Sequence, residues 1–291
     1  MSRIFEGLQH SEAERSGEQY RAPAESVAEL LQSAERETQK VDAFAAAPAL
    51  RPTPAADSRL VCLTDQGSLG AEKFRVLGLR LRHLRDQRKL KRIVVTSTIP
   101  EEGKSVVAAN LALNQARSKV LKTVLVDGDL RRPTQATRFG FNRSLPGLSE
   151  CLRGERELAD VVYSLEGSGL RFLPAGIAPE NPMELMQAGR LAGFFEQLEA
   201  FFDWIIIDTP PIFPLADTPL WMKLADGVLM VTREGVSERK LLGRAVEAID
   251  RSTLLGVVVN SCSGHAQKYY YSRYAPVVVE SPEAPSPKAE S

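Results

Sequence analysis

Three consecutive residues, Gly103-Lys104-Ser105, follow a short turn and open an apolar run that is typical of a helix. The stretch before the turn, 93–97, is rich in β-branched residues and predicts a strand. At the N-terminus of a helix the first backbone N–H groups have no partner, and they favour an anion. Lys104 is placed to reach the outer phosphates of a nucleotide, and the Ser105 hydroxyl to bind Mg²⁺. The pattern therefore favours phosphate chemistry, with an ordinary strand–turn–helix connection as the alternative.

The loop departs from the strict phosphate-loop pattern. That pattern has glycine five residues before Gly103, where this chain has Thr98. Glu101 and Glu102 also bring two carboxylates into a loop that is expected to hold phosphate. The assignment therefore depends on whether later motifs supply the rest of a nucleotide site.

Two later strand ends carry carboxylates. Asp127 and Asp129 follow the apolar run 123–126, and such a pair can hold a metal or accept a proton. Arg131 can neutralise phosphoryl charge. Asp208 closes a second apolar run, which is the usual place for a further Mg²⁺ support downstream of a phosphate loop. Each motif is common by itself, but the three in this order predict a nucleotide site.

An alternation of strands and helices supplies the scaffold that these side chains need. It predicts an α/β fold, a parallel sheet with helices on both faces, in which ligands bind beyond the carboxyl ends of the strands. The runs 93–95, 205–207 and 257–259 are continuously apolar, as expected for strands that are covered on both faces. The expected strands are 60–63, 92–97, 123–126, 170–173, 204–208, 227–232 and 255–260. The expected helices are 71–86, 104–118, 183–202 in two pieces, 216–225 and 237–251.

The composition of the 291 residues excludes several classes of protein. Lys+Arg and Asp+Glu both total 37, so the net charge indicates no particular partner. The sequence has no apolar run of about 18 residues and no signal-peptide core, so no membrane-spanning or secreted segment is predicted. Cys62, Cys151 and Cys262 form no metal-ligand pair and are interpreted as reduced thiols of a cytoplasmic protein.

The chain divides by composition into three parts. Residues 1–57 are interpreted as an N-terminal segment with short amphipathic helices and a Pro/Ala-rich linker, 58–275 as the α/β domain, and 276–291 as a disordered tail. A basic run over 80–92 is expected to be a solvated helix face, with acidic lipid headgroups or a partner's tail as the alternative. No aromatic residues are interleaved with these bases, so nucleic-acid binding is not expected.

With these motifs the chain resembles the bacterial tyrosine kinases, the autokinases of capsule and exopolysaccharide production. The resemblance extends over about residues 58–275. It rests on 98–105 as the Walker A motif, 124–131 as an additional Walker A′ motif, 205–208 as the Walker B motif, and the stretches 173–176 and 181–185. The family's C-terminal tyrosine cluster is matched by Tyr269, Tyr270, Tyr271 and Tyr274.

The resemblance implies an ATP-dependent protein-tyrosine autokinase that regulates exopolysaccharide or capsule biosynthesis or export, with ATP and Mg²⁺ as cofactors. Ser105, Asp127 and Asp208 would hold the metal, and the four clustered tyrosines would be phosphorylated. The catalytic residues would be Lys104, Asp127, Asp129 and Arg131, with the division of base and metal duties between the two aspartates left open. The loop residues expected to bind the nucleotide are Thr98, Pro100, Glu102, Gly103, Lys104, Ser105 and Val106.

The resemblance also implies partners. The opening 2–6 is similar to soluble family members that are encoded apart from their membrane partner, so a membrane polysaccharide copolymerase, or chain-length regulator, is expected to activate the kinase. The protein would be cytoplasmic, recruited to the inner face of the plasma membrane, and a homo-oligomer through its tyrosine tail. The family's Glu-x-x-Arg-x-x-Arg oligomerisation motif appears in this chain as Glu72-x-x-Arg75-x-x-Gly78, with Arg80 two places late. The family also usually has glycine where this chain has Glu101.

Two other functions are compatible with the same motifs. One is a positioning ATPase, resembling the cell-division-site and plasmid-partitioning ATPases of this fold. Those carry a second lysine five residues before the invariant one, where this chain has Ile99, which counts against them. The other is a nucleotide-binding regulator without kinase activity, for which Glu101 is the argument.

Overall fold

The computed structural model describes residues 44, 47–118, 120–187, 190–213 and 217–262. The chain divides into two units, 1–46 and 47–291, and the second unit contains the sheet and its flanking helices. Within its described residues, none of the helices is both long and apolar enough to span a bilayer.

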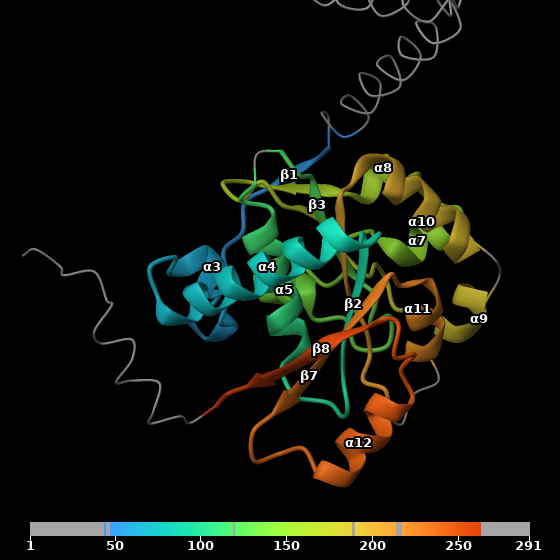
Figure 1. Ribbon diagram of the computed structural model, residues 1–291. Helices are drawn as coiled ribbons and strands as arrows, with labels where there is room; N and C mark the ends of the chain where they lie inside the picture. The colour runs from blue at the N-terminus through green and yellow to red at the C-terminus, as the bar shows by residue number, and fades with distance from the viewer. Residues whose placement is uncertain (1–43, 45–46, 119, 188–189, 214–216, 263–291) are drawn as a thin grey trace, which may run out of the picture. The chain divides into compact units, whose positions relative to one another are not determined.

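An eight-stranded sheet forms the centre of this unit (Figure 1). Its order is β1-β4-β5-β3-β6-β2-β7-β8, and all neighbours are parallel except β4 and β5. The strands are β1 (Ala49–Leu50), β2 (Arg92–Ser97), β3 (Thr123–Asp127), β4 (Tyr163–Leu165), β5 (Arg171–Leu173), β6 (Trp204–Asp208), β7 (Gly227–Arg233) and β8 (Leu254–Asn260). The predicted α/β fold with a largely parallel sheet is confirmed.

Helices connect the strands. The longer ones are α4 (Leu69–Gln87), α5 (Lys104–Gln115), α10 (Arg190–Phe201), α11 (Thr218–Leu224) and α12 (Arg239–Glu247). The shorter ones are η1 (Ala56–Ser58), α3 (Val61–Thr64), α6 (Gln135–Arg138), α7 (Leu148–Arg153), α8 (Leu158–Val161) and α9 (Pro182–Gln187).

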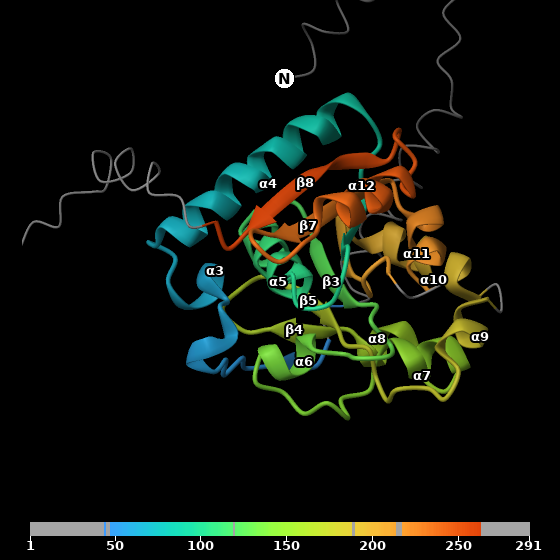
Figure 2. The same cartoon turned by 90° about the horizontal axis from the view of Figure 1, so that it is seen from below.

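The central strands are buried on both faces, as their continuous apolar runs predict. On one face Val95, Ile206 and Leu229 belong to a core cluster that also includes the buried side of α5. Successive side chains of a strand point to opposite faces, so Ile207 faces the other layer. There α10 and α11 meet, and the rings of Phe195 and Trp221 make an edge contact with centroids 5.9 Å apart. Figures 1 and 2 show α3, α4 and α5 on one side of the sheet and α10 and α11 on the other.

Two strand predictions need correction. The run 60–63, predicted as a strand, is the short helix α3, because a four-residue apolar run fits either structure and in this fold packs against α5. The last strand, β8, lies at the edge of the sheet and is not covered on both faces. Val257 and Val259 are 42% and 54% exposed, because they point to the face that α5 does not cover. Residues 49–50, assigned to the linker by composition, form β1.

The basic run is not simply a solvated helix face. Arg85 pairs with Asp203 at 3.3 Å, and its guanidinium lies 4.9 Å from the centre of the Trp204 ring. Arg92 pairs with Asp226 at 3.0 Å. These contacts hold the end of α4 and the start of β2 against the neighbouring strands. Much of the basic run is therefore engaged in contacts within the protein.

Candidate phosphate-binding and catalytic site

The three predicted motifs meet at the carboxyl ends of β2, β3 and β6. In the register of β3 and β6, Asp127 lies opposite Asp208. The amide of Gly128 donates to the carbonyl oxygen of Asp208 at 2.8 Å, and a Cβ atom at this glycine would lie 3.0 Å from the same oxygen. Beyond β2 the loop 98–103 leads into α5. The sheet therefore brings together residues that are up to about a hundred positions apart in sequence.

The phosphate loop owes its shape to two left-handed residues. Glu101 has φ 68° and Gly103 has φ 94°. Glycine is suited to such a conformation, whereas a residue with a Cβ atom is strained there by roughly 1–2 kcal/mol. A Cβ at Gly103 would also lie 2.1 Å from Nδ2 of Asn260, so a larger residue here would have to displace that side chain. Nδ2 of Asn260 donates to the carbonyl oxygen of Glu102 at 3.0 Å and ties the loop to the end of β8.

Glu102 does not present its carboxylate to a phosphate. The side chain is fully buried, and Oε2 accepts a hydrogen bond from the Ile99 amide at 2.9 Å. Oε1 accepts from the hydroxyl of Ser237, in the connection between β7 and α12. The carboxylate of Glu102 therefore holds the loop in place, and nucleotide binding by this residue stays a prediction.

Replacing Glu102 by alanine is expected to lower the free energy of unfolding by about 1–3 kcal/mol, because it leaves the part-buried amide of Ile99 without its acceptor and removes the hydrogen bond from Ser237. Urea unfolding of the purified variant measures this loss. Glu101→Ala is the matched control, since it changes the exposed neighbour in the same loop, and a shift within about 0.5 kcal/mol is expected. Equal losses in the two variants would contradict the bracing role.

Lys104 is held among carboxylates at the start of α5. Its Nζ lies 3.3 Å from Oδ2 of Asp129, and its side chain is 13% exposed. Burial by itself would lower the pKa of Lys104, but the charges of Asp208, Asp129 and Asp127 outweigh it and raise the pKa above its usual value. The ammonium is therefore charged at neutral pH and is positioned in a pocket of negative charge.

Asp127 is fully buried and is cradled by backbone amides. Oδ2 accepts from the amides of Thr134 and Gln135 at 3.2 and 2.9 Å, and Oδ1 from the amide of Asp129 at 3.3 Å. Burial, together with the charge of Asp208, nevertheless raises the pKa of Asp127 to about 8. The charge of Lys104 acts to lower the pKa of Asp127, but it does not cancel the effect of burial.

Asp208 shares the same pocket and has an oxygen available. Oδ2 accepts from Nε2 of Gln135 at 2.8 Å, whereas Oδ1, also buried, accepts no hydrogen bond that meets the usual geometric limits among the described residues. Burial raises the pKa of Asp208, and the nearby Lys104 and Ser105 hydroxyl only partly oppose this. A buried carboxylate oxygen beside a serine hydroxyl fits a hydrated cation, so the donor set suits Mg²⁺.

Within the described ranges, no group of three or more His, Cys, Asp or Glu side chains is arranged to hold a metal ion by itself. Mg²⁺ rarely uses such a cage, because it keeps several waters and takes one or two protein oxygens together with those of the phosphates. The arrangement of Ser105 and Asp208 is consistent with that mode of binding.

Arg131 has a partner that the sequence analysis did not foresee. Its Nε and Nη2 donate to the two carboxylate oxygens of Asp217 at 2.5 and 3.0 Å. The Asp217 side chain is 2% exposed, while that of Arg131 is 39% exposed. Arg131 is therefore fastened at the rim of the site. Gln135 was likewise not predicted from the sequence, and its position four residues after the Asp-x-Asp-x-Arg motif is the one signal that could have indicated it.

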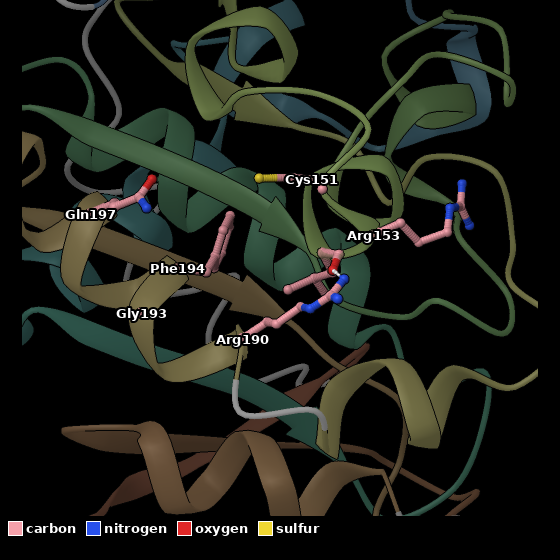
Figure 3. Close-up of a pocket in the computed structure, with 8 residues that line it drawn as sticks. Cys151, Arg153, Arg190, Gly193, Phe194 and Gln197 are labelled. Atoms are coloured by element: carbon pink, nitrogen blue, oxygen red, sulfur yellow. Dashed lines mark hydrogen bonds between the residues drawn. The ribbon is translucent and has the colours of Figure 1, made fainter.

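A cavity of about 290 Å³ lies between α7 and α10 and does not include any of these residues (Figure 3). Nη1 of Arg190 donates to the carbonyl oxygen of Leu152 at 2.7 Å. Arg153 pairs with Glu150 and Glu155. This cavity is separate from the phosphate loop and the aspartates and is not part of the site.

The four clustered tyrosines lie outside the described residues, as does the predicted tail. The structure thus brings together the phosphate loop, Asp127, Asp129 and Asp208, and it places Arg131 beside them. It leaves the tyrosines untested.

The chain is similar to known proteins and to solved structures. The chain is 33% identical over 216 residues to the tyrosine-protein kinase YwqD of Bacillus subtilis (strain 168). The matched region covers 73% of this chain and 90% of that protein. Among solved structures, the chimerical protein CapA2B2 is similar with a TM-score of 0.65 and 32% identity, covering 76% of this chain and 97% of that one. The kinase domain of the Escherichia coli tyrosine kinase ETK is similar with a TM-score of 0.67 and 25% identity, covering 71% of this chain and 81% of that one. No family model matches the chain.

The parallel sheet, the phosphate loop and the aspartates at the strand ends define a P-loop nucleotide-binding protein. The similarity to YwqD over nearly all of that protein identifies the family: the chain belongs to the bacterial tyrosine-protein kinases. The resemblance inferred from the motifs is confirmed, and the chain is an enzyme of the tyrosine-kinase class.

Proposed function

We propose that this protein transfers the γ-phosphoryl group of ATP to tyrosines of its own C-terminal cluster and thereby regulates the synthesis or export of an exopolysaccharide or capsule. The observation that carries the site assignment is the convergence of Lys104 with three buried or nearly buried carboxylates at the carboxyl ends of β2, β3 and β6. In parallel sheets this is the edge at which ligands bind.

The geometry supports a division of roles among the aspartates. Both carboxylate oxygens of Asp127 accept hydrogen bonds from backbone amides, so Asp127 is the least free of the three aspartates to take a proton from a substrate. Asp208 has a buried oxygen available, and with Ser105 it would hold Mg²⁺, which supplies charge neutralisation for the phosphates. Asp129 then serves as the base: its Oδ2 accepts from Nζ of Lys104, and it becomes free when Lys104 turns to the phosphate.

The transfer step requires that base. The tyrosine oxygen forms a bond to the γ-phosphorus while the bond to the β–γ bridging oxygen breaks, and ADP leaves with the electron pair. Free tyrosine has a pKa near 10, so its proton must pass to a nearby acceptor at neutral pH. In this proposal Asp129 accepts that proton, and Lys104 and Arg131 stabilise the charge on the transferred group.

The activating partner in this proposal is a membrane polysaccharide copolymerase that recruits the kinase to the inner face of the plasma membrane. The similarity to the chimerical protein CapA2B2 supports a partner of the CapA type. Assembly into a homo-oligomer through the tyrosine tail is part of the same proposal, as are the domain limits 58–275 and the tail 276–291.

Incubation of the purified full chain with Mg·ATP, followed by mass spectrometry of its peptides, tests the proposal. Phosphate is expected on the tyrosines of the cluster, and a variant with all four changed to phenylalanine serves as the control: Tyr269, Tyr270, Tyr271 and Tyr274. Release of inorganic phosphate without any phosphotyrosine would instead favour a positioning ATPase. Nucleotide binding without either product would favour a regulator.

A further inference from the structure

One buried glutamine contacts all three motifs of the site through its side chain and its backbone amide. Gln135 is the first residue of α6 and is fully buried. Its Nε2 donates to Oδ2 of Asp208 at 2.8 Å and to the carbonyl oxygen of Ser105 at 2.9 Å. Its backbone amide donates to Oδ2 of Asp127 at 2.9 Å. A single residue thus contacts the Walker A helix, the Walker A′ aspartate and the Walker B aspartate.

The two donors of the Gln135 amide group lie at a fixed angle, so binding both acceptors fixes how the first turn of α5 sits against the end of β6. The hydrogen bond to Asp208 also settles which carboxylate oxygen is engaged. Oδ2 is held by the amide, and Oδ1 is left available on the side of the Ser105 hydroxyl. Without Gln135 no other side-chain amide among the described residues would hold the Asp208 carboxylate in this rotation.

We propose that Gln135 is a positioning residue of the metal–nucleotide site, which orients Asp208 and the first turn of α5 so that a serine hydroxyl and a carboxylate oxygen face one Mg²⁺ position. The inference rests on the proposed function, because it takes the site to be that of Mg·nucleotide. It assigns to Gln135 no contact with the substrate. Its effect is therefore expected in the coupling between Mg²⁺ and nucleotide binding.

Replacing Gln135 by methionine tests this, because methionine has a similar length and no hydrogen-bonding amide. The measurement is calorimetric titration of the full chain with ADP, with and without MgCl₂. In the wild type, Mg²⁺ is expected to tighten ADP binding. In Gln135→Met this gain is expected to fall about tenfold, which corresponds to about 1.4 kcal/mol, while ADP affinity without Mg²⁺ changes less than about twofold.

Gln115, at the end of α5, offers a matched control. Like Gln135, it is buried, and its Nε2 donates to a backbone carbonyl oxygen, here that of Gly78 at 3.2 Å. In both glutamines Oε1 accepts no hydrogen bond from the described residues. Gln115→Met removes the same kind of side chain away from the three motifs. It is expected to retain the whole gain in affinity from Mg²⁺, whatever it loses in thermal stability.

Gln135→Asn is a second variant, which keeps the amide but shortens its reach by one carbon, so that it cannot span both acceptors. The same loss of the Mg²⁺-dependent gain in ADP affinity is expected, and this variant tests the proposal if the methionine variant does not fold. A Mg²⁺-dependent gain that is unchanged in a folded Gln135 variant would overturn the inference alone, and so would an equal loss in Gln115→Met. A wild type that binds no ADP under either condition would overturn the proposed function and this inference with it.

Discussion

Lys104→Met is expected to reduce ATP-dependent tyrosine phosphorylation by about a hundredfold or more, the loss typical of removing one preorganised charge at a developing anion. The structure places this ammonium 3.3 Å from Asp129 and within the field of Asp127 and Asp208. Its raised pKa keeps it charged across the neutral range. The measurement is the rate of phosphate incorporation from Mg·ATP, followed with an anti-phosphotyrosine signal and by mass spectrometry.

The same substitution also affects the folded state. Lys104 is mostly buried, so its removal leaves three carboxylates without their ammonium, and a lower melting temperature is expected at neutral pH. Circular dichroism must therefore show that the variant is folded at the assay temperature. Lys91→Met is the matched control: this partly buried lysine donates to the carbonyl oxygen of Glu199 at 3.1 Å, outside the site. A folded Lys104→Met protein with the wild-type rate would refute the active-site assignment.

The sequence allowed the principal residues of the site to be predicted because each of them follows a continuous apolar run. Strands that are buried on both faces produce such runs, and the carboxyl ends of parallel strands share one edge of the sheet. Lys104, Asp127 and Asp208 could therefore be placed together without knowledge of the strand order. The order itself, with β6 between β3 and β2, has no local signal, and neither does the helix at 60–63, where a short apolar run fits two structures.

Contacts between residues far apart in sequence were beyond the reach of pattern analysis. Arg131 and Asp217 are separated by 86 positions, and Glu102 and Ser237 by 135. Gln135 reaches a carboxylate 73 positions away. Nothing in the composition around these residues distinguishes a buried, bridging side chain from an exposed one in a polar turn. Their roles follow only from the packing of α6, α11 and the β7–α12 connection against the strand ends.

Asp127→Asn is expected to stabilise the protein in the absence of nucleotide. Burial and the charge of Asp208 raise the pKa of Asp127 to about 8, whereas an aspartate in an unfolded chain has a pKa of about 3.9. Between these values the folded protein retains a proton that the unfolded chain has released. The free energy of unfolding therefore decreases as the pH rises from about 4 to about 8.

Asparagine removes this dependence on pH, because its side-chain amide does not titrate in this range. Its oxygen can still accept hydrogen bonds from the amides of Thr134 and Gln135. The stability of the wild type is thus expected to fall, relative to that of Asp127→Asn, as the pH is raised from about 5 to about 8. At pH 8 the variant is expected to be more stable by about 1 kcal/mol or more, or by roughly 2–4 °C in Tm. Thermal unfolding of both proteins, followed by circular dichroism across this range, measures the difference.

Asp226→Asn provides a control of opposite sign. Burial acts to raise the pKa of Asp226, but hydrogen bonds from the backbone and side chain of Arg92 and from the Lys91 amide outweigh it and lower the pKa below its usual value. Its charge stabilises the fold above about pH 4, and that contribution is lost as the pH falls through the lowered pKa. Asp226→Asn is therefore expected to be less stable than the wild type at pH 7, while Asp127→Asn is more stable. If the stability of Asp127→Asn instead followed that of the wild type in parallel from pH 5 to pH 8, Asp127 would be ionised in the folded protein, and its charge would already be neutralised within the site.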